Sequence, residues 1–85
     1  FQQARLDYNT AFSKYLNEKE NMALTKKIYD KTMIKYKEGL ASSLDLSQVQ
    51  SQHLQAQTNY YNAVLELVQA KTKLDRLVSN NSENL

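Results

Sequence analysis

The stretch YKEGLASSLDL at residues 36–46 decides the fold, because it carries the one glycine of the 85-residue chain. Gly39 suits the left-handed C′ position that ends a helix. The following segment from Ser42 to Asp45 reads as a capping box. In such a box the serine hydroxyl accepts from the amide of the aspartate, and the carboxylate accepts from the amide of the serine. A stop signal and a start signal this close together predict a tight turn between two helices.

Long segments without proline or a second glycine flank this turn on both sides. Each is long enough for a helix on the order of 55 Å. The sequence therefore predicts a first helix at residues 1–38, a tip at 39–41 and a second helix at 42–79. The remaining residues, 80–85, are rich in Asn and Ser and are expected to form a frayed tail.

Apolar and small side chains recur every seventh residue in both segments, which is typical of a coiled coil. In the first segment they are Phe1, Tyr8, Tyr15, Met22, Tyr29 and Tyr36, with Ala4 and Ala11 beside them. In the second they are Leu46, His53, Tyr60, Leu67 and Leu74, with Val49, Ala56, Ala63, Ala70 and Leu77 in the next lane. Folding at the tip brings the lanes together: Tyr29 near His53, Met22 near Tyr60, Ala11 near Ala70. We expect an all-α fold, an antiparallel two-helix coiled-coil hairpin with closely spaced axes.

The second segment carries a further apolar stripe, which comprises Leu54, Tyr61, Val64, Leu65, Val68 and Val78. A two-helix hairpin has only one seam, so this stripe would face water in a monomer. It predicts additional helices, from other copies or from missing parts of the same protein. The isolated hairpin is expected to self-associate, as a dimer that forms a four-helix bundle.

Composition excludes several kinds of site. The chain has no cysteine and a single histidine, so thiol chemistry, cysteine-ligated metals and multi-histidine metal sites are not expected. No glycine-rich phosphate loop or nucleophile–base spacing is present, which predicts no enzyme activity and no cofactor. No segment reaches the roughly 18 apolar residues of a membrane-spanning helix. We expect His53 to be a packed residue of the seam.

Charge is distributed unevenly along the chain. Five lysines crowd residues 26–37, whereas residues 46–65 carry no formal charge and several glutamines. The uncharged stretch fits an aqueous passage, a polar contact between helices or an ordinary solvated face. A nucleic-acid partner is not expected, because the net charge is only +2 and the tyrosines lie on the seam, where they cannot stack on bases.

The tip sequence at residues 36–46 resembles the TolC family of outer-membrane efflux proteins. The resemblance continues through residues 48–50, 54–57, 60–63 and 70–77. It matches the last periplasmic hairpin of that family with its C-terminal tail. Because residue 1 is phenylalanine, we expect the chain to be a processed or excised piece of a longer protein.

The resemblance implies a role in export. Family members are trimers whose hairpins form an α-barrel across the periplasm, so the protein is expected at the outer membrane with this segment in the periplasm. The hairpin tips open or close the entrance and meet the hairpin tips of a membrane-fusion adaptor. An inner-membrane pump supplies the energy of this tripartite pump or type I secretion system.

The resemblance also implies roles for individual residues. Gly39 and Leu40 match the adaptor-facing tip signature, with Ser42 and Ser43 beside them. Tyr36 matches a position whose hydroxyl tethers neighbouring helices in the closed entrance.

Asp45 matches an acidic position that lines the constriction. The chain departs from the family at Glu38, at Ala41, where a basic residue is usual, and at Gln48, where a second acid is usual. The acid ring and the salt-bridge network that close the entrance are therefore not carried over to this chain.

Each of these residues also has a simpler structural interpretation. Gly39 and Asp45 are cap residues, and Tyr36 is a residue of the seam. The alternative function for the whole chain is a freestanding oligomeric coiled-coil adaptor or scaffold protein. A basic helical nucleic-acid binder is a third, weaker possibility.

Overall fold

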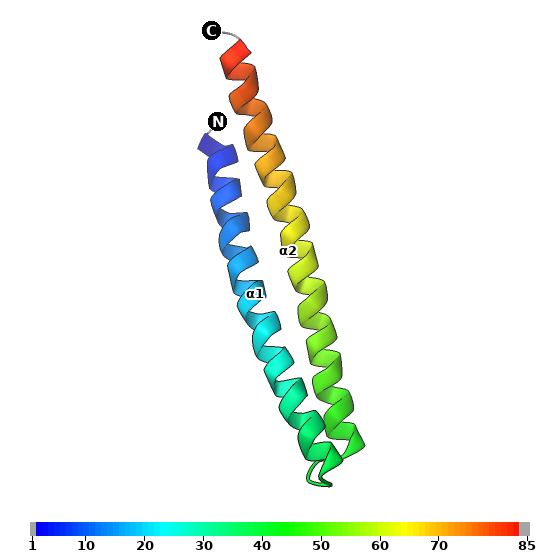
Figure 1. The fold of residues 1–85 in the computed structure, drawn as a ribbon. Helices are drawn as coiled ribbons and strands as arrows, with labels where there is room; N and C mark the ends of the chain where they lie inside the picture. Colours follow the sequence, from blue (N-terminus) through cyan, green and yellow to red (C-terminus); the bar gives the residue numbers. More distant parts are fainter. Residues whose placement is uncertain (1, 84–85) are drawn as a thin grey trace.

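The chain folds into two long antiparallel helices joined by one turn (Figure 1). The computed structural model describes residues 2–83, in which α1 spans Gln2–Lys37 and α2 spans Ser43–Glu83. The helices lie side by side in a rod with principal extents of 69 × 14 × 13 Å. No strand occurs between residues 2 and 83. The predicted all-α helical hairpin is confirmed.

The element boundaries differ from the predicted ones by a few residues. α1 ends at Lys37, one residue early, and α2 begins at Ser43 because Ser42 serves as its cap. α2 continues through residues 80–83, which were predicted as part of a frayed tail. Asn and Ser are weak helix formers, but unlike Pro they do not break a helix. Residues 1, 84 and 85 of the predicted helix and tail lie outside the described part of the chain.

Within residues 2–79 the buried side chains are all alanines. Ala4 and Ala11 lie in α1, seven residues apart, and Ala56 and Ala63 have the same spacing in α2. Ala63 is completely inaccessible to solvent, with 0% exposure. Small side chains at heptad spacing allow two helix axes to approach closely. The predicted seam of small residues is therefore present.

Contacts between the helices define their register. The Tyr29 ring stacks on the His53 ring at a centroid distance of 6.2 Å, as predicted. Tyr60 was predicted beside Met22, and its ring lies 5.7 Å from that of Tyr15, which is one heptad before Met22 in α1. A tyrosine ring stands well away from its own backbone, so it can reach from one layer of the seam to the next.

Candidate functional site

The end of α1 has the hydrogen bonds of a Schellman motif. The Leu40 amide donates to the carbonyl of Lys35 at 2.8 Å, and the Gly39 amide donates to the carbonyl of Tyr36 at 3.1 Å. Gly39 has a φ of 77°, the left-handed conformation that this motif requires. Apart from atoms of the glycine itself and its two chain neighbours, a Cβ at Gly39 would meet no atom within 4 Å, so backbone conformation and not space demands the glycine. The predicted stop signal is confirmed.

The start of α2 has the predicted capping box. The Asp45 amide donates to the Ser42 hydroxyl at 3.1 Å, and the Ser42 amide donates to Oδ2 of Asp45 at 3.1 Å. Each residue thus satisfies a backbone donor of the other. The Asp45 carboxylate also lies in the first helical turn, where the helix dipole favours a negative charge.

Two leucines dominate the surface of the tip. Leu40 is 73% exposed and Leu44 is 76% exposed, the highest values among the large apolar side chains of the described residues. Gly39, Ser42 and Ser43 are exposed as well. The turn therefore gathers at one end of the rod the residues for which docking is predicted, and the exposed Leu44, which was not among them, lies there too.

The signal for Leu44 was available in the heptad pattern. Leu44 lies two residues before Leu46, a seam position, and residues two apart in a helix point about 200° apart. An apolar residue at such a position must face outward, directly after the cap. Its exposure follows from that spacing.

The two predicted entrance residues lie on either side of the turn. Tyr36 is in the last turn of α1 and is 42% exposed. Asp45 is in the first turn of α2 and is exposed, with one carboxylate oxygen bonded to the Ser42 amide. Both side chains can be reached by a neighbouring molecule, but the contacts found for Asp45 are those of a cap.

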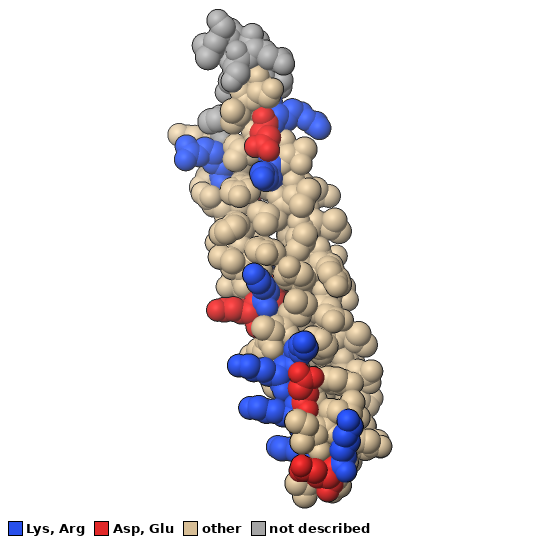
Figure 2. All heavy atoms as spheres, in the orientation of Figure 1, with Lys and Arg blue, Asp and Glu red and all other residues tan. Residues whose placement is uncertain are grey.

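Basic side chains surround the tip end of α1. Figure 2 shows blue side chains gathered over the lower part of the rod, while the visible face of α2 is largely uncharged over the same length. The lysines at residues 26–37 are all exposed. The ion pair found among residues 2–83 lies elsewhere, between Lys14 and Glu66. These lysines therefore form a solvated basic surface near the tip.

His53 is held in the seam by polar partners on both ring nitrogens. Nδ1 lies 3.0 Å from the Thr25 hydroxyl, and Nε2 lies 3.3 Å from the side-chain nitrogen of Gln57. The Thr25 hydroxyl donates to the carbonyl of Met22 at 3.0 Å, so Nδ1–H of the ring donates to Thr25. Nε2 then accepts from Gln57. A neutral ring satisfies every partner, which fits the packed histidine that the sequence predicts.

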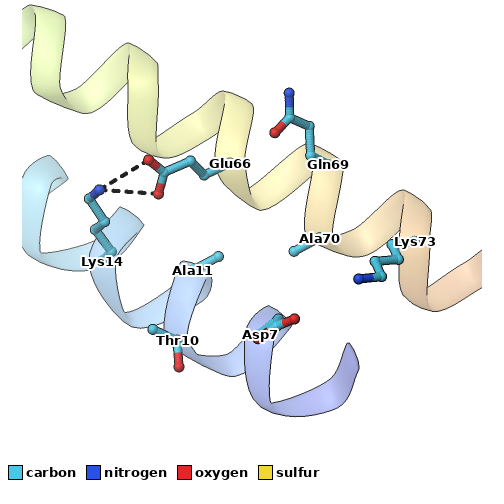
Figure 3. Close-up of a pocket in the computed structure, with 8 residues that line it drawn as sticks. All are labelled: Asp7, Thr10, Ala11, Lys14, Glu66, Gln69, Ala70 and Lys73. Carbon is cyan, nitrogen blue, oxygen red and sulfur yellow. Dashed lines mark hydrogen bonds and ion pairs between the residues drawn. The ribbon is translucent and has the colours of Figure 1, made fainter. Parts of the chain in front are cut away.

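A shallow groove of about 370 Å³ lies between the helices near the chain termini (Figure 3). The Lys14 ammonium bridges both carboxylate oxygens of Glu66 at 3.1 Å, while Ala11 and Ala70 point into the gap between the helices. Both charged partners are about half exposed, at 49% and 48%. The groove is lined by charges of both signs. We interpret the Lys14–Glu66 ion pair across it as a contact that stabilises the packing of the two helices.

The pKa of one tyrosine, Tyr60, is raised. A hydrogen bond with the Tyr15 side chain raises the pKa of Tyr60 above its ordinary value, and partial desolvation and the hydroxyls of Tyr15 and Tyr61 act in the same direction. The raised pKa favours the neutral phenol of Tyr60.

Within residues 2–83 no group of three or more His, Cys, Asp or Glu side chains is arranged to hold a metal ion. Neither helix, as far as it is described, contains a segment apolar enough to cross a membrane. No known family, curated protein or solved structure matches the chain.

Proposed function

We propose that the chain is a periplasmic hairpin of a TolC-like outer-membrane efflux or secretion duct, and that its tip docks a membrane-fusion adaptor. The hairpin would be one part of the α-barrel of a trimeric parent protein. An inner-membrane pump would act on the duct through the adaptor. Support comes from the likeness of residues 36–46 to the family and from the geometry of the turn.

The observation that carries this proposal is the exposed leucine pair at the tip. Leu40 and Leu44 lie beside a turn that is fixed by the Schellman motif and the capping box. Apolar side chains on a rigid support lose little conformational entropy when a partner covers them. The tip of a second hairpin would fit such a narrow, blunt surface.

Tyr36 and Asp45 are proposed to contribute to the entrance of the duct. Both are exposed next to the tip, where a neighbouring subunit could contact them. Gln48 cannot supply the second acid of the family, and Ala41 cannot supply its basic residue. Closure of this entrance would therefore rest on tyrosine hydrogen bonds and on Asp45 alone.

A freestanding coiled-coil adaptor or scaffold is the second candidate. It is favoured by the apolar side chains that remain exposed along the shaft, among them Leu54, Tyr61 and Leu65. The parent gene discriminates between the two candidates. A duct protein should encode a second, similar hairpin upstream with strand-like segments between the two, whereas a scaffold should not.

Docking can be tested with the hairpin of a membrane-fusion adaptor as the immobilised probe. Leu40→Glu should weaken binding about tenfold or more, because it places a charge in the centre of the apolar contact. Leu24→Glu is the matched control, since Leu24 is 56% exposed but lies on the shaft of α1. Circular dichroism should show unchanged helicity for both variants.

Equal binding by the two variants would refute the docking role of the tip. Absence of binding by the unaltered chain to every adaptor hairpin tried would favour the scaffold.

A further inference from the structure

Five aromatic rings form a continuous row across the shaft. Tyr8, Phe12 and Tyr15 of α1 follow one another at centroid distances of 6.2 Å, and Tyr15 is 5.7 Å from Tyr60 of α2. Tyr60 is in turn 5.8 Å from Tyr61. The row therefore passes from one helix to the other through the Tyr15–Tyr60 contact.

Apolar side chains extend this row along both helices. Leu54, Tyr61 and Val68 are seven residues apart and therefore share one side of α2, with exposures of 55%, 61% and 55%. On α1, Phe12 and Leu16 are four residues apart and are exposed too. We call the surface formed by these five residues the aromatic face.

The opposite face of the hairpin is charged. Lys14 lies two residues from Phe12 and thus about 200° around α1, and it pairs with Glu66 across the groove of Figure 3. Asp7 and Lys73 line the same groove. Figure 2 shows a broad uncharged region across both helices in the upper middle of the rod. The hairpin therefore has one side that carries the Lys14–Glu66 pair and another side on which exposed aromatic and aliphatic side chains gather, and water faces both.

Charges at the end of the aromatic face complement one another under two-fold symmetry. Arg5 is one heptad before Phe12 and Asp75 is one heptad after Val68, so both belong to this face. Arg5 lies nine residues from Lys14, and Asp75 lies nine residues from Glu66, both toward the open end of the rod. Because Lys14 pairs with Glu66, Arg5 and Asp75 are level with each other. In a pair of hairpins related by a two-fold axis along the rod, α1 of each copy covers α2 of the other at the same level.

We propose that, when the hairpin is isolated and not part of a larger barrel, its aromatic face binds a second copy of this chain, face to face and with both tips at the same end. Arg5 of each copy then meets Asp75 of the other, so the two-fold axis generates two equivalent ion pairs between the copies. Lys19 and Lys26, one and two heptads after Phe12, come level with Tyr61 and Leu54 of the second copy and meet no like charge there. With tips at opposite ends, Arg5 could not reach Asp75.

The first test is the association state of the full chain, measured by analytical ultracentrifugation over a range of concentrations. A dimer is expected. Tyr61→Lys should raise the dissociation constant about tenfold or more, because it buries a charge in the contact. Leu24→Lys, with similar exposure on the other side of α1, should leave it unchanged. A monomer or trimer, or equal weakening by the two variants, would overturn the proposal.

The second test concerns orientation. Arg5→Glu and Asp75→Arg should each weaken the dimer, and the double variant should restore it, because the pairs re-form with exchanged signs. The chain has no cysteine, so one introduced at position 47, two heptads before Tyr61, can be labelled selectively. Tips at the same end predict a short distance between the two labels.

Tips at opposite ends would separate those labels by on the order of 40 Å and would overturn the proposed arrangement. Neither test involves the tip leucines or an adaptor. Loss of adaptor docking in Leu40→Glu and loss of dimerisation in Tyr61→Lys can therefore occur independently.

Discussion

The tip and the shaft of this hairpin are stabilised by different kinds of interaction. At the tip, hydrogen bonds between residues at most five positions apart end α1 and cap the start of α2. In the shaft, small side chains and rings from residues far apart in the chain meet along a seam. The tip is therefore determined by local chemistry, and the shaft by the register of two helices.

This difference indicates where each region is sensitive to change. A tip held by its own backbone can expose leucines to solvent without losing its shape. At the buried alanines of the seam, by contrast, added volume should be costly, because the two helices pack closely there. Substitutions in the two regions should thus differ in size and in mechanism.

The largest effect is expected for Ala63→Leu in the shaft. Ala63 has 0% exposure, so the larger side chain must push the helices apart, at a cost of about 1–3 kcal/mol in the free energy of unfolding. Urea unfolding followed by circular dichroism measures this change in stability. Both variants are compared at the same protein concentration, because association adds to the apparent stability. Ala23→Leu, at an exposed site, should change stability by less than about 0.5 kcal/mol. Similar values for both would mean that the seam is loosely packed.

At the tip, Gly39→Ala should cost about 1–2 kcal/mol. An L-residue at a φ of 77° brings Cβ too close to the following carbonyl oxygen. Gly39→Asn is the control, because asparagine adopts this conformation more readily than alanine does. Thermal unfolding should show a smaller loss of stability for Gly39→Asn than for Gly39→Ala. Equally small losses of stability for Gly39→Ala and Gly39→Asn would mean that the left-handed conformation at Gly39 does not limit the stability of the turn.

Ser42→Ala should cost about 1 kcal/mol, because the Asp45 amide at the start of α2 loses its hydrogen-bond acceptor. The neighbouring Ser43→Ala should be close to neutral, since Ser43 is the first residue of α2 and not its cap. Chemical unfolding of the two variants measures the difference. Equal losses would contradict the capping role of Ser42.

The cross-helix ion pair of the shaft should contribute less. A double-mutant cycle on Lys14→Ala and Glu66→Ala is expected to give a coupling of about 0.2–1 kcal/mol, because both groups are half exposed. The coupling should decrease in 1 M salt, where screening is strong. A coupling that does not respond to salt would argue against a mainly electrostatic contact.

The smallest effect is restricted to alkaline pH. The raised pKa of Tyr60 in the folded chain means that the neutral phenol stabilises the hairpin. This contribution is complete below the ordinary tyrosine pKa of 10.0 and is lost as pH rises through the folded-state value. Tyr15→Phe removes the main cause, so tyrosinate absorbance of Tyr60 should appear at lower pH. An unchanged titration in that variant would refute the role of Tyr15.

The sequence predicts the tip more completely than the shaft, because the tip signals are local. Gly39, Ser42 and Asp45 each act on backbone groups a few residues away, so their roles follow from spacing alone. Leu44 was missed because the heptad pattern directs attention to residues that face the seam. Its outward direction could have been deduced from its distance to Leu46.

In the shaft, the alanine seam and the Tyr29–His53 contact were predictable from heptad spacing. The aromatic row was not, because it depends on how far a ring reaches beyond its own layer. Phe12, one turn from both Tyr8 and Tyr15, was the available signal on α1. The continuation to Tyr60 requires the relative rotation of two helices, which a single sequence does not specify.

The slenderness of the rod has a mechanical consequence. The hairpin is 69 Å long and about 14 Å wide, and the one change of direction within residues 2–83 lies at one end. Such a body behaves as a lever: a tilt of a few degrees about the open end sweeps Leu40 and Leu44 sideways by roughly the breadth of a side chain. Whatever holds the far end would thereby control whether the leucines meet their partner, without any rearrangement of the turn itself.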